Sequence, residues 1–273
     1  SGFAPKKTFS QNFLTDPGIA DKIVAALEIT SGDMVLEVGP GTGVLTQRIL
    51  RTEAAGLAAI DLDARSVDHL RAQAWTKDVR CRLVQGDALA TTAEHLFPDT
   101  DRAHRAIIGN IPYAITSELI FWAFGQRPTV SRVVMMMQRE VARRCVARPG
   151  TKEYGILSVA TWLHADAKIL FHVQPGSFFP RPDVTSSVIR YRLREQLPSP
   201  VDPEPFMRFV RAAFSMRRKV MTNALHEWAR RERIEIRAGV PVGGVDLGRT
   251  RAEELEPEAL ADLYRALTAQ EAA

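Results

Sequence analysis

Apolar and polar residues form a clear helical pattern near the start of the chain. Between Pro17 and Leu27, the apolar residues Ile19, Ile23, Val24 and Leu27 recur at a spacing of three or four. Residues at this spacing lie on one face of a helix. The segment is therefore predicted to be an amphipathic helix.

The next apolar run, Met34 to Val38, is short and unbroken, as expected of a buried strand. The glycines Gly39, Gly41 and Gly43 follow it directly, and they allow the backbone to turn sharply and approach a ligand. A helix is expected from Val44. A strand, a glycine-rich loop and a helix begin a doubly wound α/β domain, in which ligands bind beyond the carboxyl ends of the strands. The pattern indicates a nucleotide-like cofactor.

Further strands are predicted at βαβ spacing, at residues 57–60, 82–85 and 106–109. A proline-rich linker follows at residues 197–205, and residues 206–267 have the pattern of several helices. The fold class predicted is a Rossmann-like α/β domain with a small C-terminal all-helical domain. The expected division is an arm at residues 1–16, the α/β domain at 17–197 and the helical domain at 198–273.

Composition narrows the class of protein. The chain has 273 residues, 45% of them hydrophobic, a formal net charge of +4 and a pI near 9.3, so a polyanionic partner is permitted but not required. Cys81 and Cys145 form no disulfide framework, and neither they nor the scattered histidines have metal-ligand spacing. No apolar run approaches the ~20 residues of a membrane span, and no secretory segment opens the chain. We expect a soluble, cytoplasmic protein without a metal.

The glycine loop itself favours one cofactor over another. The dinucleotide fingerprint is G-x-G-x-x-G, whereas this loop is preceded by Glu37 and has Pro40 between its first two glycines. Because proline lacks an N–H group, the loop has one donor fewer for a pyrophosphate, which counts against NAD. The E-x-G-x-G-x-G form resembles the loop of methyltransferases that use S-adenosylmethionine.

Acidic residues follow the next two predicted strands. Asp61 ends the second strand about twenty residues beyond the loop, where such folds place an acid on ribose hydroxyls. Asp87 follows the third strand, where its carboxylate is placed to accept from an exocyclic amine. Each acid alone is also a normal helix cap, so both interpretations stay open.

The fourth strand leads into Asn110-Ile111-Pro112-Tyr113, which suits methylation of an amino group on an aromatic ring. The lone pair of such a nitrogen is delocalised, so the nitrogen is a poor nucleophile. The Asn110 carboxamide oxygen and a backbone carbonyl near Pro112 can accept its two N–H bonds and favour a pyramidal nitrogen. Tyr113 offers a ring on which the base can stack. The alternative is an ordinary turn.

With these motifs the chain resembles the small-subunit ribosomal RNA adenine dimethyltransferases over nearly its whole length. The matching stretches, in order, are FSQNFL (9–14), EVGPGTGVLT (37–46), IDLD (60–63), GDAL (86–89), GNIPYAITS (109–117), QREVARR (138–144), YGILSV (154–159), FFPRPDVTSSV (178–188) and RRKVMTNAL (217–225).

The resemblance implies roles for individual residues. Asn110, Pro112 and Tyr113 would hold the target adenine, and Phe178 would stack on its other face. Two interpretations of Phe179 stay open: it packs in the core, or it is the ring that stacks. The cofactor, S-adenosylmethionine, is expected to contact Gln11, Asn12, Leu14, Glu37, Gly39, Gly41, Asp61, Leu62, Asp87, Ala88 and Asn110.

Two positions depart from the family pattern. Asp61 stands where the family usually has Glu, so an acid shorter by one methylene group has to reach the ribose and is expected to contact one hydroxyl well and the other poorly. Ala114 stands where Asn or Tyr is commoner, and no function is attached to this difference.

The C-terminal helical region is rich in cations, at Arg208, Arg211, Arg217, Arg218, Lys219, Arg230, Arg231 and Arg233. A run of charges is often only a solvated face. Together with the resemblance, the cluster favours contacts to RNA phosphates, with Arg217, Arg218 and Lys219 as the RNA-binding residues expected.

The function predicted is dimethylation of the exocyclic N6 amine of adenines in small-subunit rRNA, late in assembly of the subunit. The partner expected is rRNA within a pre-ribosomal particle, bound by a monomer. Two alternatives stay open: a large-subunit rRNA methyltransferase of the macrolide-resistance type, and a mainly non-enzymatic ribosome assembly factor.

Overall fold

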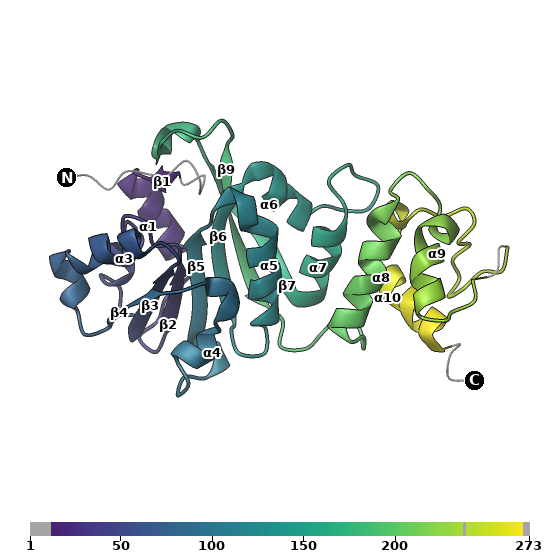
Figure 1. Ribbon diagram of the computed structural model, residues 1–273, viewed down its shortest axis with the longest axis horizontal. Helices are drawn as coiled ribbons and strands as arrows, with labels where there is room; N and C mark the ends of the chain where they lie inside the picture. The colour runs from purple at the N-terminus through teal and green to yellow at the C-terminus, as the bar shows by residue number, and fades with distance from the viewer. Residues whose placement is uncertain (1–11, 237–238, 270–273) are drawn as a thin grey trace. The chain divides into compact units, whose positions relative to one another are not determined.

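The computed structural model describes residues 12–236 and 239–269. The chain forms two compact units, each built from two segments (Figure 1). The first unit comprises Ser1–Ala142 and Ala165–Glu195, and the second comprises Arg143–His164 and Gln196–Ala273. The chain therefore leaves the first unit, returns to it and leaves it again.

A seven-stranded sheet forms the first unit. Its strands, in spatial order, are β4 (Cys81–Gln85), β3 (Gly56–Asp61), β2 (Met34–Val38), β5 (Arg105–Asn110), β6 (Arg132–Gln138), β9 (Ser186–Leu193) and β7 (Ala165–Val173). The first five strands are parallel, and β9 is antiparallel to both β6 and β7. As a result, the carboxyl ends of β2, β3, β4 and β5 meet at one edge of the sheet.

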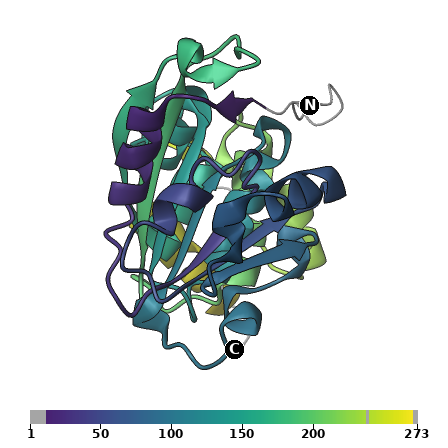
Figure 2. The same cartoon turned by 90° about the vertical axis from the view of Figure 1, so that its left-hand side faces the viewer.

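Helices cover both faces of this sheet. The helices α1 (Pro17–Ala25) and α2 (Thr46–Ile49) pack on one face, where their apolar side chains join those of β2, β3, β5 and β6 in one core. On the other face lies α5 (Thr116–Gly125), whose Phe124 ring meets Tyr191 of β9 edge-on at 5.4 Å. Figure 1 shows α5 in front of the strands, and Figure 2 shows the purple α1 along one side. The unit is a three-layer α/β domain.

Short polar residues set where several helices begin. The Asp16 carboxylate accepts from the Ile19 N–H at the start of α1, and Pro17 occupies the first turn, where no N–H is needed. Asp63 caps α3 (Ala64–Arg71) in the same way. The first unit also contains the short helix α4 (Ala93–Leu96). The helix α6 (Arg139–Cys145) begins in the first unit, which extends to Ala142.

The second unit is helical. It contains α7 (Ile156–His164), α8 (Pro203–Ser215), α9 (Met221–Arg231), the 3-10 helix η7 (Ala252–Glu254) and α10 (Pro257–Thr268). Aromatic rings form its core: Phe209 lies 5.0 Å from Trp228 and 5.6 Å from Tyr264 between ring centroids. Both α8 and α10 also pack against α7.

The elements that were predicted agree closely with this fold, whereas the strands β6, β7 and β9 were not predicted. The strand expected at Met34–Val38 has those bounds, and the three later strands are longer than expected by one or two residues. The helix expected from Val44 begins instead at Thr46, because the turn after Gly43 takes up the two residues between them. Residues 143–164, expected in the α/β domain, lie in the second unit. The domain bounds given above stay a prediction.

Candidate active site

The glycine loop lies directly beyond the carboxyl end of β2. Gly39, Gly41 and Gly43 have φ values of 68°, 56° and 80°, in the left-handed region that favours glycine. Space is also short: a Cβ atom on Gly41 would lie 2.9 Å from the Phe13 ring, and one on Gly43 would lie 2.6 Å from Trp75. Backbone conformation and the close approach of Phe13 and Trp75 therefore both favour glycine in this loop, and Gly39 and Gly41 line a pocket.

That pocket brings together most of the predicted site. It is lined by Asn12, Phe13, Leu14, Glu37, Gly39, Pro40, Gly41, Thr42, Val44, Leu45, Asp61, Asn110, Ile111, Pro112 and Tyr113. These residues come from the ends of β2, β3 and β5 and from the short strand β1 (Phe13–Leu14). The pocket thus lies where a doubly wound sheet binds its ligand.

Two carboxylates meet in the pocket. Glu37 is 1% exposed, and among the described residues neither its carboxylate oxygens nor the Thr46 hydroxyl has a hydrogen-bond partner. Burial raises the pKa of Glu37 to about 7, the charge of Asp61 adds to this, and nearby Thr46 opposes it. Asp61 is 8% exposed and accepts from the Asp63 N–H at 2.9 Å. An unpartnered buried acid of this kind suits a cationic ligand.

Asn110 is held by the arm that precedes α1. Its amide nitrogen Nδ2 donates to the backbone oxygen of Asn12 at 3.1 Å. With the nitrogen engaged, the carboxamide oxygen is the atom left to accept from a ligand. The Pro112 carbonyl accepts from the Thr116 hydroxyl at 3.1 Å, which uses part of its capacity. Asn110 is thus oriented as an acceptor.

Tyr113 is fixed at both ends. Its hydroxyl lies 2.7 Å from the Ser186 hydroxyl of β9, and burial raises the pKa of the phenol while Ser186 opposes the rise. The phenol is therefore neutral at physiological pH, and the ring is held at the edge of the pocket rather than free to rotate.

The two phenylalanines of β8 (Phe178–Phe179) differ from expectation. β8 pairs antiparallel with β1, with Phe13 opposite Phe179 and Leu14 opposite Phe178. Phe178 is 4% exposed and belongs to the core beside Leu14, whereas Phe179 is 66% exposed. Packing of Phe179 in the core, one of the two interpretations left open by the sequence, is therefore wrong. In this structure Phe179 presents the accessible ring, and the stacking role of Phe178 stays a prediction.

Four predicted cofactor contacts are not among the residues that line the pocket. Gln11 lies outside the described residues. Leu62 is 62% exposed, and Ala88 is buried. Asp87 is exposed and accepts from the Leu89 N–H at 2.9 Å, as a cap of the 3-10 helix η3 (Ala88–Ala90). The capping interpretation of Asp87 is therefore realised, and its cofactor contact stays a prediction.

Several pocket residues were missed in the sequence, chiefly Phe13, Thr42 and Ile111. Their side chains carry no chemical signature, because they contribute shape rather than charge. The Phe13 ring packs where Gly41 has no side chain. An aromatic residue and a distant glycine cannot be paired from one sequence.

The expected RNA-binding cluster lies in the second unit. Arg217 donates through Nε to a Glu253 carboxylate oxygen at 2.6 Å and through a second nitrogen to the Thr151 carbonyl at 3.0 Å. Arg218 and Lys219 are exposed. The three cations are therefore not equivalent, because the charge of Arg217 is already paired.

Among the residues that the structure describes, no group of three or more His, Cys, Asp or Glu is arranged to hold a metal ion. None of the described helices is long and apolar enough to cross a membrane.

The chain is similar to known proteins over nearly its whole length. A model of the family described as "Ribosomal RNA adenine dimethylase" matches residues 2–262. The chain is 41% identical over 268 residues to "Ribosomal RNA small subunit methyltransferase A" of Salinibacter ruber, a match that covers 98% of this chain and 86% of the relative.

Two solved structures have the same fold over most of the chain. A dimethyladenosine transferase from Plasmodium falciparum has a TM-score of 0.73 and 27% identity, covering 92% of this chain and 95% of that one. The 23S rRNA methyltransferase ErmE has a TM-score of 0.67 and 27% identity, covering 94% and 99%. The predicted Rossmann-like methyltransferase fold is confirmed.

Proposed function

The chain belongs to the ribosomal RNA adenine dimethylase family, and we propose that it dimethylates the N6 amine of adenines in small-subunit rRNA. It is a methyltransferase whose methyl donor is S-adenosylmethionine. The small subunit is favoured because relatives that carry this name match nearly the whole chain at about 40% identity.

The pocket fits the methyl donor. S-adenosylmethionine, when bound, supplies an activated methyl group on a cationic sulfonium. Glu37 is a buried acid without a hydrogen-bond partner among the described residues, and Asp61 is a second acid at the end of the next strand. We assign Glu37 to the cationic end of the donor and Asp61 to its ribose hydroxyls. The open backbone at Gly39 and Gly41 admits the donor without a side-chain clash.

The observation that carries the proposal is the orientation of Asn110. Because its amide nitrogen is engaged by Asn12, its carboxamide oxygen accepts from the target N6 amine. This acceptor favours a pyramidal nitrogen, whose lone pair is then available for in-line attack on the methyl group. No strong base is required, because the methylated ammonium loses its proton readily to water. Asn110 therefore acts by position and hydrogen bonding.

The target base has to leave its stack to enter the pocket. The Tyr113 ring, held through Ser186, supports one face of the adenine, and a phenylalanine of β8 supports the other. The cations near Arg217 contact phosphates and position the rRNA without reading its sequence. We further propose that the substrate is a pre-ribosomal particle in the cytoplasm, bound by one copy of the chain.

A panel of ribosomal subunits tests the proposal. Purified small and large subunits that lack adenine dimethylation are incubated with the protein and labelled S-adenosylmethionine, and the products are analysed by mass spectrometry. We expect dimethyladenosine in small-subunit rRNA alone. In single-turnover reactions Asn110→Ala should slow transfer by at least ~100-fold, as when one preorganised hydrogen-bond partner is removed. Its affinity for the donor should change far less.

Other outcomes of this panel identify the alternatives. Label only in large subunits would favour the macrolide-resistance type of enzyme, to which the similarity to ErmE points. Tight binding of small subunits without any transfer would favour an assembly factor. An unchanged transfer rate in Asn110→Ala would remove the proposed role of its carboxamide.

A further inference from the structure

Two basic segments of the second unit lie close together although they are far apart in the sequence. One is the loop at residues 147–152, which contains Arg148 and Lys152, and the other is the turn after α8, which contains Arg217, Arg218 and Lys219. Arg217 joins them, because one guanidinium nitrogen donates to the Thr151 carbonyl at 3.0 Å. The loop and the turn are therefore neighbours on one surface.

The loop is held firmly in this place. The Gly150 N–H donates to the Glu253 carbonyl at 2.8 Å, and the Tyr154 hydroxyl donates to the Leu255 carbonyl at 2.8 Å. The Tyr154 ring is 1% exposed and meets Phe214 of α8 edge-on at 5.7 Å. Within the loop, the Thr151 hydroxyl donates to the Arg148 carbonyl at 2.7 Å. These contacts fix Arg148 and Lys152 relative to the turn.

The charges on this surface divide into paired and available cations. Arg217 is paired, because its Nε donates to the Glu253 carboxylate at 2.6 Å. Arg148, Lys152, Arg218 and Lys219 are exposed, and the described residues include no ion-pair partner for them. We call these four residues the loop–turn surface. Four unpaired cations on a fixed scaffold suit a polyanion.

We propose that the loop–turn surface contacts the phosphate backbone of the rRNA, and that Arg217 is a positioning residue that joins its two segments. This inference rests on the proposed function, which supplies the polyanion. It adds Arg148 and Lys152 to the RNA-binding residues expected from the sequence. It also changes the role of Arg217, because two of its five N–H donors hold Glu253 and Thr151 and its charge is already paired within the protein.

The salt dependence of subunit binding tests the phosphate contacts. Each contact releases condensed counterions, so its loss should make the negative slope of log K against log salt shallower by about 0.7 to 0.9. We expect this change for Arg148→Gln and for Lys152→Gln. The matched control is Arg265→Gln, which removes one cation of the same unit whose charge is already paired with Asp262 at 3.2 Å in α10. The control should change the slope by much less.

Hydrogen exchange of the free protein tests the positioning role. Arg217→Met removes both donors that hold Thr151 and Glu253, so exchange should quicken across residues 148–154. Arg218→Met removes the same charge from the next residue and should leave exchange in the loop unchanged. Equal exchange in the two variants would overturn the positioning role of Arg217.

These outcomes separate the inference from the proposed function. If the wild-type protein neither binds nor methylates small subunits, the proposed function fails first. If it does both, and Arg148→Gln and Lys152→Gln retain the wild-type salt slope, only the loop–turn surface is overturned. Unchanged affinity for S-adenosylmethionine in every variant shows that the fold of the first unit is intact.

Discussion

Glu37 combines full burial with an unsatisfied carboxylate, which makes it sensitive to pH. Burial raises its pKa to about 7, and the charge of Asp61 adds to the rise. The Cys81 thiol is also affected. Burial, followed by the charge of Glu37, raises the pKa of Cys81 to about 11. At neutral pH the free protein therefore holds Glu37 in both protonation states.

Cofactor binding should depend on this titration. If the Glu37 carboxylate binds the cationic end of S-adenosylmethionine, affinity should rise about tenfold between pH 6 and pH 8, as the fraction of ionised Glu37 increases. Calorimetry at both pH values measures this change. In Glu37→Gln the affinity should be lower and independent of pH.

The same pKa also sets a dependence of stability on pH. Because the folded pKa is raised above the unfolded value near 4.5, the stabilisation is complete below pH 4.5 and is lost as the pH rises through about 7. Glu37→Gln should remove this decline.

A wild-type affinity that is equal at pH 6 and pH 8 would show that Glu37 does not bind the donor in its charged form.

Phe178 and Phe179 require a test that separates packing from stacking. Phe178→Ala should lower the free energy of unfolding by about 3 to 5 kcal/mol, since its ring is 4% exposed in the core. Phe179→Ala should change it by no more than about 0.5 kcal/mol, since its ring is 66% exposed. Urea denaturation measures both values.

The stacking role is better tested with leucine, which keeps most of the buried volume. We expect Phe178→Leu to stay folded and to slow methyl transfer, because stacking on a base contributes about 1 to 3 kcal/mol. Phe179→Leu is the matched variant one residue away. If it slows transfer and Phe178→Leu does not, the accessible ring of β8 is the one that stacks.

At the scale of single residues, chemistry was easier to predict than shape. Asn110 and Asp61 follow strand ends in the sequence, and both line the pocket. The burial of Phe178 was not predictable, because it depends on pairing with Leu14, which is far away in the chain. The pairing of Arg217 with Glu253 escaped prediction for the same reason.

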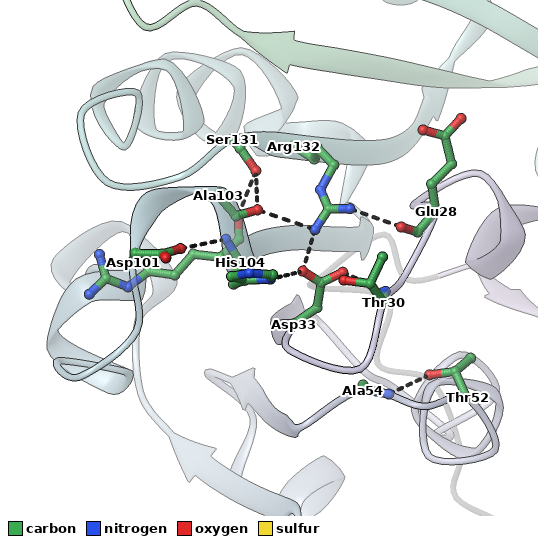
Figure 3. A network of polar contacts seen from close by, with 11 residues as sticks. Glu28, Thr30, Asp33, Thr52, Ala54, Asp101, Ala103, His104, Ser131 and Arg132 are labelled. Carbon is green, nitrogen blue, oxygen red and sulfur yellow. Dashed lines mark hydrogen bonds and ion pairs between the residues drawn. The ribbon is translucent and has the colours of Figure 1, made fainter.

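At the scale of elements, an ion network ties the amino ends of three parallel strands (Figure 3). Asp33, directly before β2, is 0% exposed and accepts from Arg132 at 2.5 Å and from the Thr30 N–H at 2.7 Å. His104, directly before β5, lies 3.2 Å from the same carboxylate. Arg132 begins β6 and also donates to the Glu28 carbonyl. The network lies at the edge of the sheet opposite the pocket.

Breaking this network should destabilise the sheet. Burial alone would raise the pKa of Asp33, but Thr30, Arg132 and His104 outweigh burial and lower it from 3.8. At pH 7, Asp33→Asn should cost about 3 kcal/mol, because it leaves a largely buried guanidinium without its counter-ion. Thermal or urea unfolding measures the change. Asp68→Asn, which breaks an exposed pair with Arg71, should cost no more than about 0.5 kcal/mol.

The effect of Asp33→Asn has a defined dependence on pH. Because the folded pKa is lowered, the stabilisation is present at neutral pH and is lost as the pH falls below about 4. The difference between wild type and variant should therefore shrink in acid. A difference that stays constant from pH 7 to pH 3 would show that the ion pairs contribute little.

Elements were predictable where their pattern is local. Four of the five parallel strands, β2, β3, β4 and β5, were predicted because each is a short apolar run followed by a turn signal, and α1 was predicted from its helical period. The pairing of β1 with β8 was not found, because each strand has two residues and no periodicity. Such short strands are defined by their partners rather than by their own sequence.

At the scale of the whole molecule, the second unit is assembled from two separate segments. The proline-rich linker at residues 197–205 suggested that the helical domain begins at 198, and the second unit resumes at Gln196. A change in composition cannot reveal that α7 lies with α8 and α10. The Trp162 indole of α7 donates to the Glu258 carboxylate of α10 at 3.0 Å. The unit depends on a segment more than thirty residues upstream.

This assembly predicts how fragments behave. Residues 196–273 alone lack α7 and the Tyr154 ring that packs on Phe214, so the apolar faces of α8 and α10 would be exposed to water. Circular dichroism should show reduced helicity and no cooperative thermal transition. A matched chain, in which residues 143–164 are joined to 196–273 by a flexible linker, should melt cooperatively. Equal cooperative melting of both chains would show that α7 is dispensable, and that the helical domain begins where the linker first suggested.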